Sequence, residues 1–545
     1  MALPSRNQFS KSKKRLQSWQ KNTNSHQARE NNTMASTEDH GEQNLADTNI
    51  LSGDDEVLQE ITKQVEQSLI LNIVVFYPLL VIYFIIAFYL ITKHVPYLFI
   101  DEIFHVPQTL RYLQGEWFSW HPKITTPPGL YILGWMNYKI LKYIPLWKKC
   151  STLTLLRTTN WFGGVIVWPV FVLRPMFYFQ ALGFWPTSLM AFPLLSTYYT
   201  LYYTDVWSTI FIVQALTYVI TLPFGETKSI WLSALCVLIS VIFRQTNIIW
   251  SLFILVLVVE RRALIEQNFN TLWYNNYLKT LIHALENFYK LVLPYALNFV
   301  LFCIFLVYNR SITLGDKTNH VAGVHLVQVF YCYMFMAFFS MPLWFSKTHL
   351  VNYKTRFFSL KTFGQLILII FIIRFFTKVH PFLLADNRHY TFYIYKKILN
   401  RNKLFKYVLC PIIYHFSRYT VHELMRMSLL PLGPMQGIKV KNTLDVPSQL
   451  THVSWNVFYF CMVLTLVPSP LFEPRYYILP YIFWRVFVIA PYDSFTAYGV
   501  DKKSNLHRLK LELLWMVLIN VVTLFIFLKF KFSWTTEAFP QRIIW

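Results

Sequence analysis

The sequence predicts an all-α polytopic membrane protein, and three observations support this fold class. Hydrophobic residues make up 55% of the 545 residues, and charged residues only 14%. The mean hydropathy is +0.36, whereas a soluble chain would carry about 25% charged residues. Apolar runs long enough to cross a bilayer as helices recur along the chain, beginning at residues 69–91.

The net charge of +23 is distributed unevenly along the chain. Residues 1–66 hold eight Lys/Arg and ten Asp/Glu among many Ser, Thr, Asn and Gln, so we expect a disordered cytosolic tail there. The basic excess belongs to residues 67–545, where it suits the positive-inside rule and anionic lipid headgroups. Nucleic acid is disfavoured as a partner, because no soluble basic domain is present to bind it.

Thirteen apolar runs predict a bundle of about 12–14 transmembrane helices. If the tail is cytosolic, the first run is a retained signal anchor, and six basic loops then face the cytosol. Several runs, such as Ile230–Phe243 and Phe405–Phe416, are shorter than the roughly 17 residues that a crossing needs, which predicts tilted or broken helices around a cavity. The thirteen runs are Leu69–Ile91, Trp161–Leu173, Phe184–Tyr203, Val206–Phe224, Ile230–Phe243, Ile248–Val259, Leu291–Tyr308, Val324–Phe345, Gly364–Phe376, Phe405–Phe416, Val453–Phe472, Tyr477–Ala490 and Leu511–Leu528.

Two basic segments do not fit this alternation, because both fall on the luminal side. One is residues 396–406, and the other is residues 131–147 within the first luminal loop, 92–157. The latter carries apolar residues at helical spacing and lysines on another face. Such a pattern is as typical of an interfacial helix lying on the membrane as of a span, and the alternation requires that it does not cross.

Six polar clusters at the ends of apolar runs all fall on the luminal face under this topology. Their convergence predicts one functional site there, because charge inside or at the edge of a membrane is unusual. The alternative is that polar residues simply collect at span ends. The clusters are Asp101–His105, Thr125–Gly129, Tyr202–Asp205, Arg244–Asn247, His380–Tyr390 and Glu473–Tyr476.

The adjacent carboxylates Asp101 and Glu102 are the candidates for a general base, with His105 one turn further on. Neighbouring side chains diverge on a helix, so only one of the two acids can face a given substrate atom. A carboxylate at a low-dielectric boundary is suited to accept a proton from an attacking hydroxyl. The alternative is a pair of hydrated loop acids.

Cationic side chains on the same face favour an anionic ligand such as a phosphate or pyrophosphate. Arg244 interrupts two apolar runs, and Gln245 and Asn247 beside it are suited to bind hydroxyls or phosphate oxygens. The alternative for Arg244 is a structural ion pair with Asp205 or Asp386, and for the other cations it is interfacial snorkelling. The further candidates for substrate binding are Asp386, Arg388, His389 and Arg475.

No P-loop, GxGxxG, DxD or calcium motif occurs, and the six cysteines lack metal-ligand spacing. We therefore expect neither a metal nor another cofactor.

Five motifs, in order, closely resemble the endoplasmic reticulum alpha-1,2-glucosyltransferases that use dolichyl-phosphate-glucose. They are DEIFHVPQ, TTPPGLY, FRQTNIIW, HPFLLADNRHYTFYIYK and EPRYYILPY, and the resemblance covers the chain after residue 66. It implies a GT-C-type bundle with interfacial luminal helices in the endoplasmic reticulum membrane and an active site facing the lumen. The implied substrates are dolichyl-phosphate-glucose as donor and the diglucosylated lipid-linked oligosaccharide as acceptor.

The resemblance also implies an inverting mechanism, with one carboxylate of the first luminal loop as base. Asp101 is the first candidate and Glu102 the second. Arg244, Arg388 and Arg475, with His389 behind them, would balance the charge of the leaving phosphate.

Two other functions remain open from the sequence. One is a dolichyl-phosphate-sugar transferase with another acceptor, since the same residues would serve it. The other is a non-catalytic membrane transporter or modulator, although neither a clear internal repeat nor a mid-span carboxylate favours a transporter.

Overall fold

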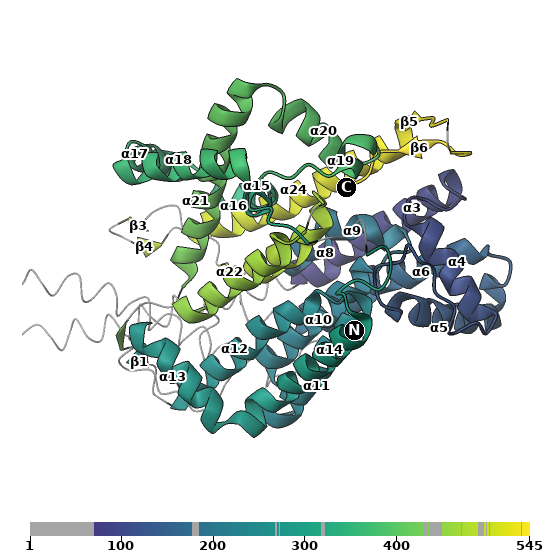
Figure 1. Ribbon diagram of the computed structural model, residues 1–545, viewed down its shortest axis with the longest axis horizontal. Coiled ribbons are helices and arrows are strands. Elements are labelled where there is room, and N and C mark those ends of the chain that lie inside the picture. The colour runs from purple at the N-terminus through teal and green to yellow at the C-terminus, as the bar shows by residue number, and fades with distance from the viewer. Residues whose placement is uncertain are drawn as a thin grey trace, which may run out of the picture.

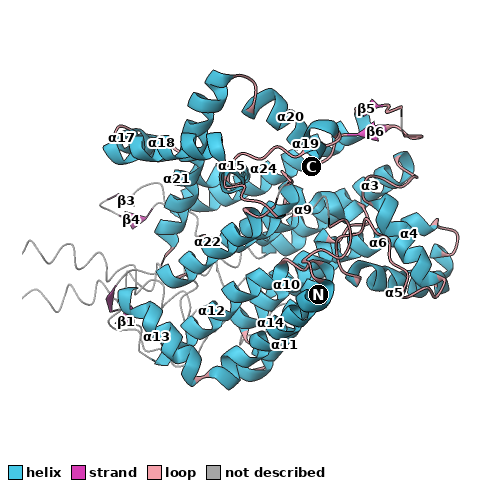
Figure 2. Cartoon of the chain, in the orientation of Figure 1, coloured by secondary structure: helices cyan, strands magenta, loops and turns pink. Residues whose placement is uncertain are grey.

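The computed structural model is built almost entirely of helices (Figures 1 and 2). Within the described residues, strands occur only as antiparallel two-residue pairs: β1 (Asn270–Thr271) with β2 (Gly433–Pro434), β3 (Phe495–Thr496) with β4 (Gly499–Val500), and β5 (Lys531–Phe532) with β6 (Gln541–Arg542). The predicted all-α fold class is confirmed. The predicted tail, residues 1–66, lies outside the described residues, which are 70–176, 185–266, 270–271, 273–317, 322–429, 433–434, 449–469, 471–488, 495–496, 499–500, 502–535 and 537–545.

The first half of the chain forms the helices of residues 92–157 and a group of long helices. In Figure 1, α10, α11, α12 and α14 lie together, and α11 contacts each of the other three. The helices are η1 (Leu71–Phe76), α3 (Tyr77–His94), α4 (Glu102–Leu113), α5 (Gly129–Tyr143), η2 (Pro145–Trp147), α6 (Thr152–Phe162), η3 (Gly163–Leu173), α7 (Arg174–Met176), α8 (Trp185–Met190), α9 (Pro193–Ser196), η5 (Thr197–Thr200), α10 (Asp205–Thr221), α11 (Glu226–Phe243), α12 (Asn247–Glu266), α13 (Trp273–Glu286), η6 (Phe288–Val292) and α14 (Leu293–Asn309).

The second half packs α15 against α21 and returns to the first half through α22, which lies on α12, and α24, which contacts α8 and α9. Its helices are α15 (Val327–Phe339), α16 (Met341–Trp344), α17 (Lys347–Phe357), α18 (Leu360–Phe375), α19 (Pro381–Ala385), α20 (Tyr390–Tyr393), η7 (Ile394–Leu399), η8 (Phe405–Leu409), α21 (Cys410–Ser428), α22 (His452–Leu466), η10 (Pro474–Tyr477), α23 (Ile478–Phe487) and α24 (Lys502–Lys529).

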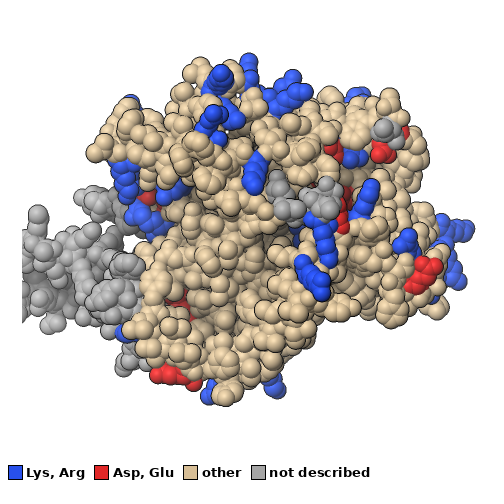
Figure 3. All heavy atoms as spheres, in the orientation of Figure 1, with Lys and Arg blue, Asp and Glu red and all other residues tan. Residues whose placement is uncertain are grey.

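Four helical segments within the described part of the chain are long and apolar enough to cross a membrane: Leu71–His94, Glu226–Phe243, Phe288–Asn309 and His507–Lys529. A fifth crossing is possible if α17 and α18, which meet at 87°, form one broken span, and three further apolar helices are shorter. The protein is therefore a polytopic membrane protein, while the total of 12–14 spans stays a prediction. Most of the face seen in Figure 3 carries neither acidic nor basic side chains, as a lipid-facing surface requires.

Several predicted runs have different boundaries in the structure. Residues 185–203 do not form one helix, because Pro193 places Phe192 in an extended conformation and starts α9 afresh. Residues 324–345 break likewise at Ser340, ahead of Pro342. Two of the runs predicted as short, Ile230–Phe243 and Phe405–Phe416, belong to long helices, α11 and the continuous η8–α21. Their extra turns are polar, so a count of apolar residues missed them.

The helix predicted from residues 131–147 corresponds in the structure to α5 and the short η2. This helix packs between α4 and α6 and leaves Ile140, Tyr143 and, just beyond it, Leu146 exposed. An apolar face of this kind fits an interfacial helix.

The segment after α24 folds back over the molecule toward the end of α3. Arg542, which is buried, donates to the carbonyl oxygens of Phe527 and His94 at 2.7 and 3.1 Å. Ile544 exchanges backbone hydrogen bonds with Arg388 and Tyr390. Residues 531–545 are thereby fixed beside the loop that carries Arg388.

Candidate functional site

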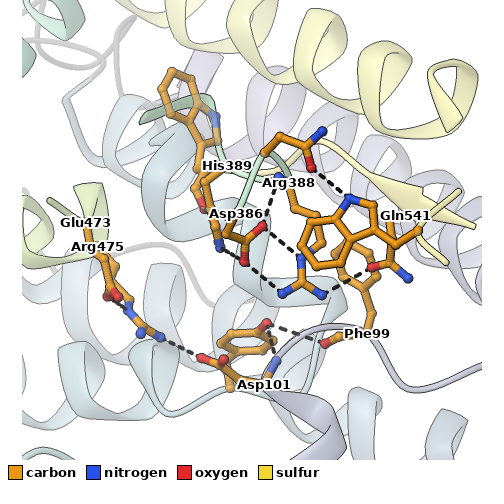
Figure 4. Close-up of polar contacts among 12 residues, drawn as sticks. Phe99, Asp101, Asp386, Arg388, His389, Glu473, Arg475 and Gln541 are labelled. Atoms are coloured by element: carbon orange, nitrogen blue, oxygen red, sulfur yellow. Dashed lines mark hydrogen bonds and ion pairs between the residues drawn. The ribbon is translucent and has the colours of Figure 1, made fainter. Parts of the chain in front are cut away.

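A cavity of about 410 Å³ lies where five segments distant in the sequence meet. It is lined by residues of the turn before α4, the η5–α10 connection, the α19–α20 region, the loop before α23 and the segment after α24. The polar and aromatic residues that line it are Asp101, Tyr198, Tyr203, Phe382, Asp386, Arg388, His389, Thr391, Phe472, Glu473, Arg475, Trp534 and Trp545. Asp101 and four of the residues predicted to bind substrate therefore line one cavity, and Figure 4 shows the contacts among them. The four are Asp386, Arg388, His389 and Arg475.

Asp101 projects into this cavity because it does not cap the helix that it precedes. It occupies the N-cap position of α4, where an Asp side chain commonly accepts a backbone hydrogen bond, but makes no such bond. Its Oδ2 instead accepts a hydrogen bond from Arg475 Nη1 at 2.9 Å, with 30% of the Asp101 side chain exposed. Ile100, immediately before it, has φ 51°, a left-handed conformation that β-branched residues avoid.

Arg475 lies between two carboxylates, Asp101 on one side and Glu473 on the other (Figure 4). Burial alone would raise the pKa of both carboxyl groups, but the charge and hydrogen bonds of Arg475 outweigh it, and both pKa values are lowered. The same two acids raise the pKa of Arg475 against the effect of its burial. All three groups are therefore charged near neutral pH, and Asp101 is a weak base as long as this pair persists.

A second ion pair forms the opposite wall of the cavity. Arg388 donates to both oxygens of Asp386, from Nε at 2.9 Å and from Nη2 at 2.7 Å, and its guanidinium lies 4.4 Å from the centre of the Trp534 ring. Gln541 accepts from Arg388 Nη1 at 3.2 Å. His389 lies 3.8 Å from Asp386 through Nε2. The segment after α24 thus holds Arg388 in place.

His105 is buried one turn into α4 and is absent from the cavity lining. Its Nδ1 is hydrogen-bonded to the Tyr131 hydroxyl at 2.8 Å. Burial lowers its pKa to about 4, although Asp101 opposes that shift. His105 is therefore neutral and bonds to Tyr131 in the interior of the protein. It does not line the cavity, and its role in substrate binding stays a prediction.

Glu102 points away from the cavity, as neighbours on a helix must. Its side chain is fully buried and paired with Arg157, whose Nη2 lies 2.6 Å from Oε2. Both Glu102 oxygens also accept backbone N–H groups, from Phe99 and Tyr202. The sequence left the base open between the two acids; of the two, the structure places only Asp101 on the cavity.

The Arg244 cluster lies outside the cavity lining, and its side chains are bonded within the protein. Arg244 Nη2 is 3.0 Å from Asp205, which is the structural ion pair weighed as the alternative. Gln245 donates to the Thr125 carbonyl at 2.9 Å, and Asn247 to the Ser208 hydroxyl at 2.8 Å. These contacts join α10 to the end of α11, to the start of α12 and to the connection between α4 and α5. Binding of phosphate or sugar hydroxyls by this cluster stays a prediction.

Several residues at the site were not predicted from the sequence. Glu473 stood in a predicted polar cluster but was not singled out, although its place two residues before Arg475 was the available signal. Arg157 looks like an ordinary charge near a span end, and Trp534 and Trp545 lie in a segment with no motif. Tyr198 and Tyr203 are two of many tyrosines. No group of three or more His, Cys, Asp or Glu able to hold a metal occurs within the described ranges.

The fold and the cavity together define a class: a helical polytopic membrane protein with a carboxylate–arginine site at the ends of its helices. The chain belongs to the DIE2/ALG10 family, whose model matches residues 95–486. No solved structure matches the chain.

Three relatives show how far the similarity extends. The chain is 56% identical to a protein of Kluyveromyces lactis, over 90% of this chain and 92% of the relative, and 54% identical to one of Candida glabrata, over 89% and 95%. It is 30% identical to a human protein over 82% of this chain and 93% of the relative. Each of the three is named Dol-P-Glc:Glc(2)Man(9)GlcNAc(2)-PP-Dol alpha-1,2-glucosyltransferase.

Proposed function

We propose that this protein transfers glucose from dolichyl-phosphate-glucose to the diglucosylated dolichyl-pyrophosphate-linked oligosaccharide, forming an alpha-1,2 linkage with inversion. The observation that carries the proposal is Asp101 held on a cavity by a partly exposed arginine, in a chain that matches nearly the full length of relatives named for this reaction. The enzyme acts in the endoplasmic reticulum membrane with this cavity toward the lumen.

In the proposed reaction, Asp101 is the general base. Its carboxylate takes the proton of the acceptor hydroxyl as that oxygen bonds to the anomeric carbon of glucose. The bond from that carbon to the phosphate oxygen breaks, and dolichyl phosphate leaves with the electron pair. Attack opposite the leaving group inverts the beta-linked donor to an alpha-linked product, through a transition state resembling an oxocarbenium ion.

The resting ion pair explains how the donor could prepare the base. Asp101 and Glu473 share Arg475, so a donor phosphate entering the cavity competes with both carboxylates for that guanidinium. When Arg475 turns to the phosphate, Asp101 loses the charge that depresses its pKa and becomes a stronger base. Binding of the donor therefore precedes deprotonation of the acceptor. The Arg388–Asp386 wall, with the Trp534 ring, is the surface against which sugar hydroxyls would bind.

The test is a transfer assay with purified protein, dolichyl-phosphate-glucose and the diglucosylated acceptor, read by acceptor mass. Wild type should add one hexose, and Asp101→Asn should add almost none while folding normally. An acceptor carrying one glucose and a dolichyl-phosphate-mannose donor are the specificity controls. Activity on either control instead would favour a transferase with another substrate, and no transfer to any acceptor would contradict the enzyme proposal.

A further inference from the structure

We infer that Glu102 and Arg157 form a positioning clamp that fixes the turn carrying Asp101 and so sets the direction of its carboxylate. Neither residue lines the cavity, so their role is exerted through Asp101 and not on substrate. This inference rests on the proposed function, because it assigns the support of the base proposed there.

The clamp is a closed ion pair between α4 and α6. Arg157 donates from Nε to Glu102 Oε1 at 2.9 Å and from Nη2 to Oε2 at 2.6 Å, and neither side chain is exposed to solvent. It also donates to the Val95 carbonyl at 2.7 Å and to the Tyr97 carbonyl at 3.1 Å. One guanidinium therefore ties the start of α4 to the backbone that leaves α3.

The carboxylate of Glu102 adds two backbone ties of its own. Oε2 accepts from the Phe99 N–H at 3.1 Å, and Oε1 accepts from the Tyr202 N–H at 2.8 Å. The next residue, Tyr203, accepts at its hydroxyl from the Asp101 N–H at 3.1 Å. Three segments, the end of α3, α6 and the η5–α10 connection, thus converge on the backbone around Asp101.

This arrangement is what the left-handed Ile100 requires. Such a conformation persists in a β-branched residue only where the surroundings impose it. Phe99 on one side of Ile100 and Glu102 on the other are both held by the clamp. The turn directs Asp101 away from α4, whose N-terminus it would otherwise cap, and toward Arg475. Loosening the clamp should let the turn relax and move the Asp101 carboxylate.

The experiment compares this ion pair with a matched one elsewhere in the fold. Arg485 and Glu512 join α23 to α24 through contacts of 2.6 and 2.7 Å, are equally buried, and lie outside the cavity. The variants are Glu102→Gln, Arg157→Lys and the control Glu512→Gln, with kcat per folded molecule and donor KM measured for each. All three should lower the thermal midpoint. Only the first two should lower kcat, by about 10²-fold, the effect of a misplaced reacting group, with donor KM unchanged.

The outcomes separate this inference from the function on which it rests. If Glu102→Gln and Arg157→Lys have the same kcat as Glu512→Gln while Asp101→Asn is inactive, the positioning role of the clamp is contradicted. The assignment of Asp101 as the base is then retained. If Asp101→Asn stays active and Glu102→Gln does not, Glu102 is itself the base and both proposals fail. Should the ion-pair variants not fold, Glu102→Asp decides, because it keeps the charge that balances Arg157 but shortens the tie to the turn. A lower kcat in that variant supports the clamp, and an unchanged one overturns it.

Discussion

Asp101 and Glu102 are consecutive acids, and each is paired with an arginine from a distant part of the chain. The Asp101–Arg475 pair is partly exposed on a cavity, and its arginine is shared with Glu473. The Glu102–Arg157 pair is fully buried, and every contact of its carboxylate is made with protein. An entering anion can replace Asp101 as the partner of Arg475, whereas no ligand can reach the buried Glu102–Arg157 pair to replace either of its members.

This difference teaches that charge near a membrane boundary has two distinct uses. A buried, fully bonded ion pair holds backbone segments in place and gains nothing from a ligand. In a shared, partly exposed pair, the cation and the base stay bonded to each other until a ligand binds the cation and frees the base. Substitutions at the two pairs should therefore differ in kind, one changing chemistry and the other changing stability and geometry.

Loss of the base should have the largest effect. Asp101→Asn keeps the size of the side chain and removes the carboxylate that accepts the proton, so we expect kcat to fall by about 10²–10⁴-fold. Donor binding should persist, because Arg475 then loses one competing carboxylate. The measurement is kcat and donor KM on detergent-purified protein, with Asp205→Asn, outside the cavity, as the control for loss of a neighbouring acid. A kcat within a few fold of wild type would place the base elsewhere.

Loss of a fully buried ion pair should have the next largest effect, and this effect is on stability and not on turnover. Glu512→Gln leaves Arg485 charged and buried without its counterion, which costs about 3–5 kcal/mol. We expect an earlier unfolding transition and an unchanged kcat for the protein that remains folded. Chemical denaturation compares the variant with wild type, and the exposed Arg356→Gln, whose partner Glu423 keeps Arg426, is the mild control. Equal stability of both variants would contradict the distinction between buried and exposed ion pairs.

The sequence predicted the fold class and named several charged residues that line one cavity in the structure, but it did not predict how these charges pair. Low charge and apolar runs sufficed for a helical membrane protein, because burial in lipid constrains composition directly. Asp101, Arg388 and Arg475 could be named because each is a charge at the end of an apolar run. Arg244 has the same pattern, yet it pairs with Asp205 outside the cavity. Only tertiary packing decides which partner a charge meets.

The helix boundaries show the same limit from another side. Apolar runs located α3 and α14 well, but they missed the polar last turns of α21 and the proline breaks at α9 and α16. A polar helical turn at a span end is stabilised by neighbours that the sequence does not reveal. The segment after α24, which supports Arg388, carries no pattern at all that would have linked it to the site.

A change in the second wall of the cavity should have a moderate effect. Arg388→Lys keeps the positive charge but loses the fork to Asp386 and the stacking on Trp534. We expect donor or acceptor KM to rise about tenfold, as for the loss of one charge-assisted hydrogen bond, with a smaller change in kcat. Steady-state kinetics with each substrate varied in turn measures this. Arg374→Lys, at an exposed position on α18, is the control. Unchanged KM values for both substrates would remove this wall from the binding site.

The smallest expected effect is a pH dependence of stability that depends on Arg475. Arg475 lowers the pKa values of Asp101 and Glu473 in the folded protein, so the stabilisation that they contribute is present above their ordinary pKa values and is lost as the pH falls through the lowered ones. In Arg475→Gln the two carboxylates repel each other without a counterion. The difference in thermal midpoint between wild type and variant should therefore be a few degrees near pH 7 and should shrink below about pH 4. His105, whose pKa burial lowers to about 4, destabilises both proteins as the pH falls below its ordinary pKa of about 6.5, so the readout is the difference between the two midpoints and not either midpoint alone. A difference that is constant from pH 7 to pH 3 would mean that the two acids are not ionised partners of Arg475, and the shared pair would lose its place in the mechanism.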